Sequence, residues 1–534
     1  MRLRQLVQLS RDDPPRADVA FLLNGTEVSA EADGTLLDAL RALGRRDVKD
    51  GCAPQGQCGC CTVLVDGKPR VSCVTPVARV AGRVVTTLEG LDADRLDPLV
   101  AAFDATAASQ CGFCTPGIVV RLAALLGRDG AVVDDRAVRT GLAAHLCRCT
   151  GFQPIVEAAL VAAGVTTLPP PRDPAAAAAR ATLESGTAQR AGADVVRGCA
   201  PFADDTAPAG ALVALGAGPG GYELAGSDRA ARAGAGVRQG RNSTVALTFP
   251  VAVPEGAFDL TLQTTWVEPG YLEPDASWCS PGGVPASPLG NAGAFGAKAA
   301  SPVAADAARL AAEHGVTVRA HWTREAVVLR GDKRPPVALG VRRDGTGVLR
   351  LARTPGSQDL TGVLSAIGQV APGVTVEVVD VHGPTVGATH RGAGVAELLA
   401  ALSVLGARPD GTCTVVTPDG ALAEVVRRDD AIHVRCDAGA PLCEATTRSF
   451  VIGAVHQGFS MVTSEGIAVD ADGTPVDLTV RSFGIVPARG MPRVEVSLVA
   501  SDAPPVAVGT AVFAATLAAV WLAEGAGPRW PTRR

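Results

Sequence analysis

Residues 51–73 read Gly-Cys-Ala-Pro-Gln-Gly-Gln-Cys-Gly-Cys-Cys-Thr-Val-Leu-Val-Asp-Gly-Lys-Pro-Arg-Val-Ser-Cys, and this stretch decides the fold of the amino-terminal part of the chain. Four of its cysteines follow the spacing C-x5-C-x2-C-x11-C, with glycines between the first three: Cys52, Cys58, Cys61 and Cys73. A [2Fe-2S] cluster needs four thiolates, so one tight loop can supply three while the fourth returns from a neighbouring strand. Glycine permits positive φ and lets amide groups turn toward anionic sulfur.

A structural zinc site is the competing interpretation of these cysteines. Zinc usually shows two separated C-x2-4-C pairs joined by a knuckle, whereas three cysteines on one glycine-rich loop with a lone fourth favour iron–sulfur. Cys60 stands beside Cys61, and only one of the two combines the x2 spacing to Cys58 with eleven residues before Cys73. We therefore predict Cys61 as the ligand.

Length and composition suggest a multidomain protein without a nucleic-acid or membrane partner. The chain has 534 residues, 47% of them hydrophobic and only 4% aromatic, so its cores must rest on Ala, Val and Leu. A net charge of −5 gives no reason to expect nucleic acid or membrane. The amino terminus lacks the apolar core of a secretory signal, and fourteen cysteines without such a signal indicate metal ligation before disulfides. We expect a cytoplasmic protein.

Residues 18–85 predict a β-grasp, ferredoxin-like domain. Two short strands flank Asn24-Gly25, a strong hairpin signal, and helical spacing follows over residues 35–43. A second hairpin around Asp66-Gly67 returns Cys73 to the cysteine loop.

Residues 90–165 change to a helical period and predict a four-helix domain with two further cysteine pairs. Thr115-Pro116 is expected to open one helix, with Thr as N-cap. The pairs are Cys111-Gly-Phe-Cys114 and Cys147-Arg-Cys149, each beside a predicted helix start, where free N–H groups favour an anionic cluster. A CxxC alone also suits redox dithiols or zinc. A CxC at the same end of a bundle, after a ferredoxin domain, favours a second [2Fe-2S] cluster.

Together these motifs resemble the iron–sulfur portion of the molybdenum hydroxylases, the xanthine dehydrogenase and aldehyde oxidoreductase family. The resemblance rests on the loop at 51–73, on Gln110-Cys-Gly-Phe-Cys-Thr-Pro-Gly117 and on Cys147-Arg-Cys-Thr-Gly-Phe152. It implies that the cluster of Cys111 lies near a molybdopterin touched by Gln110. The cluster of Cys52 would then lie outward and pass electrons to a flavin or another acceptor.

Residues 166–184 are rich in Pro and Ala and predict a semi-rigid linker. No flavin domain stands between the iron–sulfur part and the carboxy-terminal region, so the resemblance implies a separate electron acceptor, such as a flavoprotein subunit. Gly216-Ala-Gly-Pro-Gly-Gly221 satisfies the dinucleotide pattern G-x-G-x-x-G, but the segment after it is too short for the helix that such a site needs.

Residues 185–534 resemble a molybdopterin subunit at about half the usual length. Gly293-Ala-Phe-Gly-Ala-Lys298, His390-Arg-Gly-Ala-Gly394 and Gly453-Ala-Val-His-Gln-Gly458 follow the family's order. Glycine amides, a side-chain amide and an Arg suit an anionic pyranopterin bearing phosphate. The resemblance implies these cofactor contacts: Gln110, Phe295, Gly296, Arg391, Gln457 and Gly458.

Thr510 marks a departure from the family. It occupies the position of the family's catalytic Glu in Pro505-Val-Ala-Val-Gly-Thr510, and a hydroxyl cannot act as that base near neutral pH. We therefore assign no catalytic residue. Fold class is α+β multidomain: a β-grasp domain, a helical bundle, then shortened molybdopterin-binding-like domains.

Two functions are compatible with this organisation. One is a molybdenum-hydroxylase-like enzyme that passes electrons from a small-molecule substrate through two [2Fe-2S] clusters. The alternative is a non-catalytic electron-transfer or scaffold subunit, because the base is missing and the region that normally lines the substrate pocket is short. Relatives commonly dimerise, so an oligomer is compatible with the resemblance, and the sequence leaves the oligomeric state open.

Overall fold

The computed structural model describes residues 18–534 apart from 53, 128–131, 219, 237–244 and 358. The first unit is built on an open five-stranded sheet of order β2-β1-β5-β3-β4. Its strands are β1 (Asp18–Leu23), β2 (Thr26–Glu31), β3 (Thr62–Val65), β4 (Lys68–Val71) and β5 (Val84–Thr86). Both predicted hairpins are confirmed, since Asn24-Gly25 and Asp66-Gly67 turn with positive φ between antiparallel strands. β5 runs parallel to β1, so the chain crosses over the sheet between them.

Helix α2 (Leu36–Ala42) covers one face of this sheet, as the helical spacing predicted. Thr35 and Asp38 form a reciprocal capping box at its start, which satisfies two backbone N–H groups that would otherwise lack partners. Leu36, Leu37 and Leu40 are buried against the strands. The cysteine loop follows α2 and precedes β3.

Four helices make up the next unit: α3 (Ala93–Ala105), α4 (Thr115–Leu126), α5 (Asp135–Gly141) and α6 (Gln153–Ala162). The prediction of Thr115 as N-cap of α4 is wrong. Cys114 is the N-cap, Thr115 is the first helical residue, and its hydroxyl bonds to the Ser109 hydroxyl at 2.9 Å instead. Cys114 is thereby held directly at the start of the helix.

The predicted linker at 166–184 is only partly extended, because its alanine run forms helix α7 (Pro174–Ser185). Asp173 caps the helix through its carboxylate and Pro174 stands at the first helical position. Alanine has the highest helix propensity, so the alanine-rich composition that predicted a linker also favours a helix. α7 packs against α15, far along the chain.

Three open four-stranded sheets follow, with orders β7-β6-β10-β9, β13-β12-β11-β8 and β14-β15-β16-β17. Strands of the first two are β6 (Leu212–Gly216), β7 (Glu223–Ala225), β9 (Ala276–Cys279), β10 (Val318–Trp322), β8 (Leu260–Gln263), β11 (Val337–Val341), β12 (Gly347–Arg353) and β13 (Val374–Asp380). Those of the third are β14 (Cys413–Val416), β15 (Leu422–Arg428), β16 (Ala431–Asp437) and β17 (Arg493–Leu498).

Helices cover these sheets. They include α9 (Ala203–Thr206), α10 (Asp228–Ala235), α11 (Val303–His314), α12 (Arg324–Arg330), α13 (Thr361–Val370), α14 (Val395–Leu405), α15 (Glu444–Thr463) and α16 (Gly509–Ala523). The short helix α8 (Ala193–Val196) packs against α3 of the bundle. α16 is buried along nearly its whole length, so it forms part of the hydrophobic core. Within the described part of the chain, no helix combines the length and apolarity needed to cross a bilayer.

Gly216 ends β6, and the described residues after its loop form strand β7 antiparallel to β6. A dinucleotide site needs a helix at this point, so the glycine pattern is a turn between strands.

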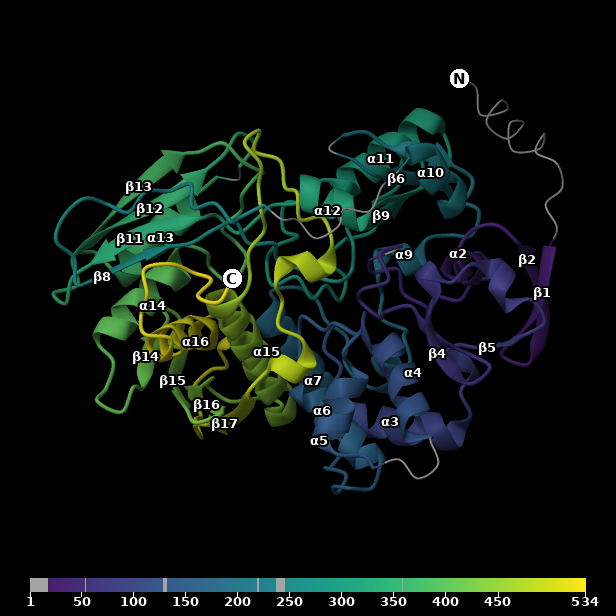
Figure 1. Cartoon of the computed structure of the whole chain (residues 1–534), viewed down its shortest axis with the longest axis horizontal. Coiled ribbons are helices and arrows are strands. Elements are labelled where there is room, and N and C mark those ends of the chain that lie inside the picture. Colours follow the sequence, from purple (N-terminus) through teal and green to yellow (C-terminus); the bar gives the residue numbers. More distant parts are fainter. Residues whose placement is uncertain (1–17, 53, 128–131, 219, 237–244, 358) are drawn as a thin grey trace.

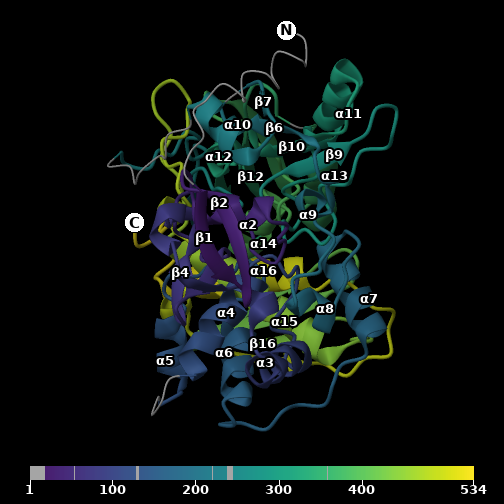
Figure 2. The ribbon, with the colours of Figure 1, turned by 90° about the vertical axis from the view of Figure 1, so that its right-hand side faces the viewer.

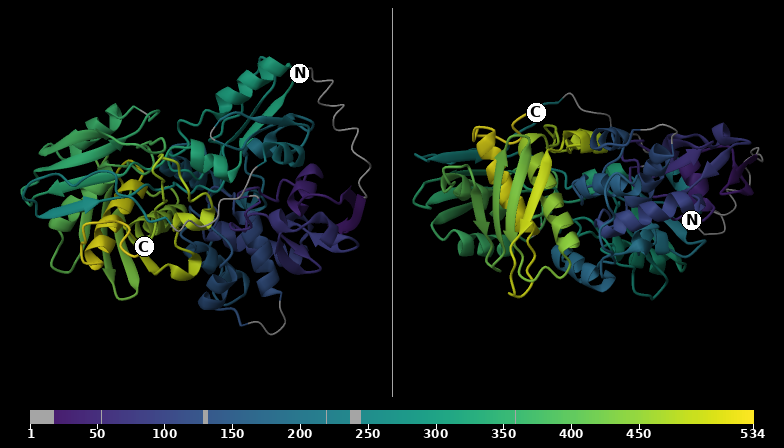
Figure 3. Two further views of the ribbon diagram at one scale, coloured as in Figure 1. Left: turned by 45° about the horizontal axis from the view of Figure 1, so that its top comes forward. Right: turned by 90° about the horizontal axis from the view of Figure 1, so that it is seen from below.

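The iron–sulfur-like units and the later sheets lie side by side (Figure 1). In Figure 1, α15 runs between α16 and the blue helices α6 and α7, and Figure 3 shows the third sheet on the far side of α15 from those helices. Figure 2 places the β1–β2 hairpin on the outer flank, below β6, β7 and α10. One hydrophobic core joins Phe103 and Phe152 of the bundle to Phe295 and Phe450 of the later region. The cysteine-bearing loops are therefore enclosed by the rest of the chain.

Candidate functional site

The first cysteine set converges at the loop between α2 and β3. Side chains of Cys52, Cys58, Cys61 and Cys73 are each at most 2% exposed. The Cys52 sulfur accepts backbone N–H groups of Gln57 and Cys58, both at 3.3 Å, and the Cys61 sulfur accepts that of Cys73 at 3.4 Å. Gly56 and Gly59 turn the loop with φ of 68° and 73°. Hydrogen bonds from the Cys58 and Cys73 thiols lower the pKa of Cys52, as expected of sulfurs in mutual contact.

Cys60 is oriented differently from its neighbour Cys61. Its thiol contacts the Cys58 side chain, whereas Cys61 contacts Cys73. Cys60 is also close enough to Cys147 of the second set for their charges to interact. Cys60 thus lies on the side of the loop that faces the second set.

The second set stands where α4 and α6 begin. Sulfur atoms of Cys111 and Cys149 lie 3.6 Å apart, and Cys147 contacts both Cys114 and Cys149. Hydrogen bonds from the Cys114 and Cys149 thiols lower the pKa of Cys147, and the Thr150 hydroxyl lies 3.1 Å from its sulfur. Cys114 is the N-cap of α4, so that helix directs free N–H groups toward this set.

The two sets are held together by glycine contacts that leave no room for a side chain. A Cβ on Gly117 of α4 would lie 2.3 Å from the Gly59 carbonyl oxygen. On the other side, a Cβ on Gly59 would lie 2.5 Å from the His145 ring, which lies 3.0 Å from the Thr62 hydroxyl. Burial lowers the pKa of His145 to about 3, so this ring is neutral. Glycine at these two positions therefore allows the two cysteine-bearing loops to approach each other closely.

These donors fit two [2Fe-2S] clusters. Each iron of such a cluster takes two protein thiolates. Each set offers four buried sulfurs in a connected group, with backbone amides or a helix start directed at them.

Arg148 lies between two cysteines of the second set and is anchored by a fully buried ion pair. Its guanidinium donates to both Glu465 oxygens at 2.6 and 2.7 Å, and to the Pro269 carbonyl at 2.9 Å. Both side chains of the pair are at most 2% exposed. Two segments far from the bundle thereby fix the backbone of the Cys-Arg-Cys loop.

The residues predicted to contact a pterin gather beside the second cysteine set, with one exception. Gln110 donates to the Cys149 carbonyl at 3.1 Å, and Gln457 to the Arg148 carbonyl at 3.2 Å. The Arg391 guanidinium donates to Gln457 Oε1 at 3.1 Å and lies 4.1 Å from the centre of the Phe295 ring.

Gly458 and Gly296 serve backbone packing. Gly458 is the exception to the gathering, because it faces Thr516 where α15 crosses α16. Gly296 has φ of 98° and docks its loop against the Thr389 carbonyl. Phe295 and Arg391 both adopt left-handed backbone with φ of 49°, a strained conformation for a residue with a bulky side chain.

Two buried polar atoms of this group have no hydrogen-bonding partner: Gln110 Oε1 and Arg391 Nη2. An acceptor and a charged donor left unpaired inside the protein are what a bound polar, anionic pterin would satisfy. Phe295 and Gln457 contact Arg391 directly, so they would have to separate to admit such a group.

Thr510 is the second residue of α16, and its methyl group lies near Gly392, beside Arg391. The sequence did not reveal that Glu184 of α7 also reaches this point. Its carboxylate accepts the backbone N–H groups of Val508 and Gly509, both at 3.0 Å. Arg180 and Glu184 stand four residues apart in an alanine-rich stretch, which indicates a local ion pair but not this contact with α16.

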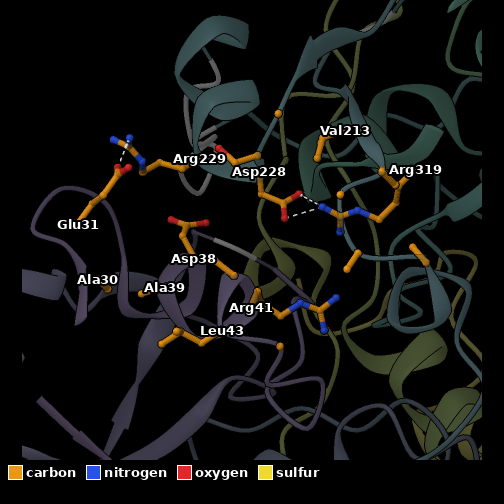
Figure 4. Close-up of a pocket in the computed structure, with 18 of the residues that line it drawn as sticks. Ala30, Glu31, Asp38, Ala39, Arg41, Leu43, Val213, Asp228, Arg229 and Arg319 are labelled. Atoms are coloured by element: carbon orange, nitrogen blue, oxygen red, sulfur yellow. Dashed lines mark hydrogen bonds and ion pairs between the residues drawn. The ribbon is translucent and has the colours of Figure 1, made fainter. Parts of the chain in front are cut away.

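A cavity of about 470 Å³ lies away from both cysteine sets, between α2 and the segment that leads into β6 and α10 (Figure 4). Ion pairs Glu31–Arg229 and Asp228–Arg319 stand on its walls. Among the described residues, Arg46 also lines the cavity and forms no ion pair, and burial together with the Arg41 charge lowers its pKa.

Comparison with known families agrees with this geometry. Residues 21–82 match the "2Fe-2S iron-sulfur cluster binding domain" and residues 87–160 the "[2Fe-2S] binding domain". These two matches cover the two cysteine sets.

Two proteins of similar sequence support the same family. The chain is 42% identical over 127 residues to the xanthine dehydrogenase iron-sulfur-binding subunit of Escherichia coli O157:H7, covering 79% of that protein and 23% of this chain. It is 43% identical over 150 residues, 27% of this chain, to the aldehyde oxidoreductase of Megalodesulfovibrio gigas, but spans only 16% of that protein's length.

The whole fold also has a counterpart among solved structures. Aldehyde oxidoreductase from Desulfovibrio gigas superposes with a TM-score of 0.70 at 17% identity, covering 97% of this chain and 99% of that one. At this identity the likeness concerns the fold alone. The sequence matches to these two relatives span 127 and 150 residues, and the first covers 79% of a dedicated iron–sulfur-binding subunit. The chain belongs to the molybdenum hydroxylase family of xanthine dehydrogenases and aldehyde oxidoreductases, with two [2Fe-2S]-binding domains.

Proposed function

We propose that this chain is an iron–sulfur oxidoreductase in which two [2Fe-2S] clusters relay electrons between a buried pterin-side site and a separate acceptor. Cys52, Cys58, Cys61 and Cys73 would hold the outer cluster. The inner cluster would be held by Cys111, Cys114, Cys147 and Cys149. The direct packing of the two cysteine loops through Gly59 and Gly117 carries this proposal.

When bound, such clusters accept and donate single electrons. The chain's own residues supply the rest. Backbone N–H groups at the Cys52 sulfur stabilise negative charge there, and the start of α4 does the same for the inner set. The apolar core and the neutral His145 ring exclude water from between the loops.

The test is metal and sulfide analysis of the purified full chain. We expect about four irons and an equal amount of acid-labile sulfide per chain, with the visible and EPR spectra of [2Fe-2S] centres. Cys61→Ser is expected to remove the outer signal and Cys149→Ser the inner one. Cys60→Ser and Cys279→Ser, which alter buried cysteines outside the ligand sets, should keep both. Zinc without acid-labile sulfide contradicts the proposal.

A non-catalytic electron-transfer or scaffold subunit is the second candidate. It is favoured by Thr510 at the position of the family's acid and by the direct contacts that Arg391 makes with Phe295 and Gln457. Stoichiometric molybdenum and pterin in the purified protein would support the enzyme with a small-molecule substrate. Iron alone would support the scaffold.

The partner is proposed as a separate electron acceptor, for which a flavoprotein subunit is the leading class. One similar protein is itself a named subunit of a larger enzyme, which supports an assembly of this kind. All fourteen cysteines are free thiols here, in keeping with a reducing, cytoplasmic compartment.

A further inference from the structure

Helix α16 begins inside the protein and lacks a cap of its own. Val508 is its N-cap, has no side-chain hydrogen bond to the helix, and the first turn holds no acidic residue. Free N–H groups at a buried helix start require acceptors, and the dipole favours an anion there. In this chain the acceptor comes from another helix, α7.

Glu184 supplies that acceptor. Its Oε1 accepts the Val508 N–H and its Oε2 the Gly509 N–H, each at 3.0 Å. Arg180, one turn earlier on α7, donates to Oε1 and also to the Ala438 carbonyl. Both side chains are fully buried, so this carboxylate is an internal ionic group with a complete set of partners.

Arg391 faces the same point from the opposite side. A Cβ placed on Gly509 would lie 2.3 Å from Arg391 Nη1 and 3.0 Å from Glu184 Oε2, so only glycine lets both groups approach the start of α16. Burial lowers the pKa of Arg391 to about 10, and the Glu184 carboxylate is the strongest charge acting against that effect, followed by Cys149. Arg391 thus faces the Glu184 carboxylate at the start of α16, and its charge also interacts with Cys149 of the inner set.

We propose that Glu184 is the acidic residue of this site: a positioning residue that reaches from α7 to the start of α16 and balances Arg391, where Thr510 offers no charge. Glu184 holds the helix start and Arg391 in place and tempers the positive charge that Arg391 places beside Cys149. The site thereby keeps a carboxylate, supplied from the opposite wall. The redox part of this inference rests on the proposed inner cluster, and the structural part does not.

A double-mutant cycle on the full chain tests the proposal with Glu184→Gln, Thr510→Glu and the double variant. Alone, Thr510→Glu is expected to destabilise the protein, because it crowds a second carboxylate against Glu184. In the Glu184→Gln background, Thr510→Glu is expected to stabilise the protein. A carboxylate at the second residue of α16 then interacts favourably with the helix dipole and meets no repulsion from Glu184. The coupling should be about tenfold in the folding equilibrium constant.

The reduction potential of the inner cluster, followed by EPR, is the second measurement. Glu184→Gln removes a negative charge that offsets Arg391, so we expect the potential to rise, and Thr510→Glu to return it toward the native value in the double variant. Glu524→Gln is the matched control, because Glu524 pairs with Arg427 and Arg533 at the other end of α16. It should lower stability without moving the potential.

The inference is overturned if Thr510→Glu acts with the same sign in both backgrounds, or if Glu184→Gln leaves the potential unchanged. Should Glu184→Gln fail to fold, Thr510→Glu alone still decides, since a stabilised single variant contradicts an anion already in place. Absence of any cluster signal would defeat the proposed function instead, while the unfolding cycle would still report on Glu184.

Discussion

The cysteine sets and the polar group around Arg391 adjoin one another, yet they are assembled by different means. Each cysteine set comes from short loops within one compact unit, so its members lie in the same part of the sequence as well as close together in space. Glu184, Gln457 and Arg391 come from α7, from α15 and from the loop before α14. They meet because α7 packs against α15 while α14 and α15 pack against α16. Ligand geometry in the first region is encoded locally, whereas charge balance in the second depends on tertiary packing.

The largest effect is expected from a substitution at the contact between the two regions. Gly453 of α15 lies against the inner loop so closely that a Cβ would stand 1.7 Å from the Cys149 carbonyl oxygen. Gly453→Ala must therefore push α15 away from the Cys-Arg-Cys loop. We expect a loss of more than about 4 kcal/mol of unfolding free energy, or no folded protein, and loss of the inner EPR signal. Denaturant unfolding and EPR of the purified variant measure both.

Gly368→Ala in α13 is the control for this change. A Cβ at Gly368 has no neighbour within 4 Å, so the same substitution in a helix should be neutral or stabilising by up to about 1 kcal/mol. A Gly453→Ala protein with native stability and both cluster signals would show that the two regions are not rigidly joined.

The next effect concerns the ion pair that ties the inner loop to the later region. Glu465→Ala leaves the Arg148 guanidinium buried without its carboxylate, which typically costs about 3–5 kcal/mol. Asp380→Ala removes an equally bidentate partner from Arg353 at the surface, where the two side chains are 51% and 74% exposed, and should cause no measurable change. Equal effects of the two variants in chemical unfolding would contradict the inferred role of burial.

Residues near the cysteines could be predicted from sequence because spacing and turn chemistry act over a few residues. The two hairpins, the helical bundle and the convergence of the thiols follow from Asn24-Gly25, Asp66-Gly67 and the Cys spacings. Thr115 was misplaced by one position, since the Cys114 backbone already closes the first turn of α4 and the Ser109 hydroxyl engages Thr115.

Glu184 could not be predicted from sequence in this way. No local sequence pattern predicts that a carboxylate in an alanine-rich stretch will cap a helix whose N-cap residue lies 324 residues later. Gly458 was predicted to contact a cofactor, but in the structure it faces Thr516 where α15 crosses α16. Its role, too, depends on tertiary packing. Motifs identify the donors of a site, but which partner balances a buried charge is decided by packing.

A pH effect is expected from His456, which lies in α15 between the two regions. Burial lowers its pKa to about 4, and its Nε2–H donates to the Val486 carbonyl at 2.8 Å, so the folded protein holds the ring neutral. Below pH 6.5 the unfolded chain takes up a proton that the folded chain does not, so stability falls as the pH drops from 6.5 to 4. The expected loss from this residue is about 3 kcal/mol.

Unfolding titrations at several pH values measure this slope. His456→Gln keeps a donor for the Val486 carbonyl and should reduce the pH dependence between 6.5 and 4, while the buried, neutral His145 still contributes to it. His433→Gln is the control, because His433 lies on the surface strand β16 with its ring beside Glu495. An unchanged slope in His456→Gln would show that this ring is not held neutral by burial.

The smallest expected effect lies at the cavity between the first unit and α10. Arg41 and Arg319 there are both paired with Asp204, whereas Arg46 forms no ion pair among the described residues. Burial and repulsion by Arg41 act on its charge more strongly than attraction by Asp204 and Asp205. Arg46→Gln is therefore expected to change the unfolding free energy by less than about 0.5 kcal/mol, and in the stabilising direction. Arg41→Gln, which removes one cationic partner from each of the buried Asp204 and Asp205, should be clearly destabilising in the same assay. A destabilised Arg46→Gln protein would mean that this junction depends on all three arginines, as the site around Arg391 depends on its whole set of charges.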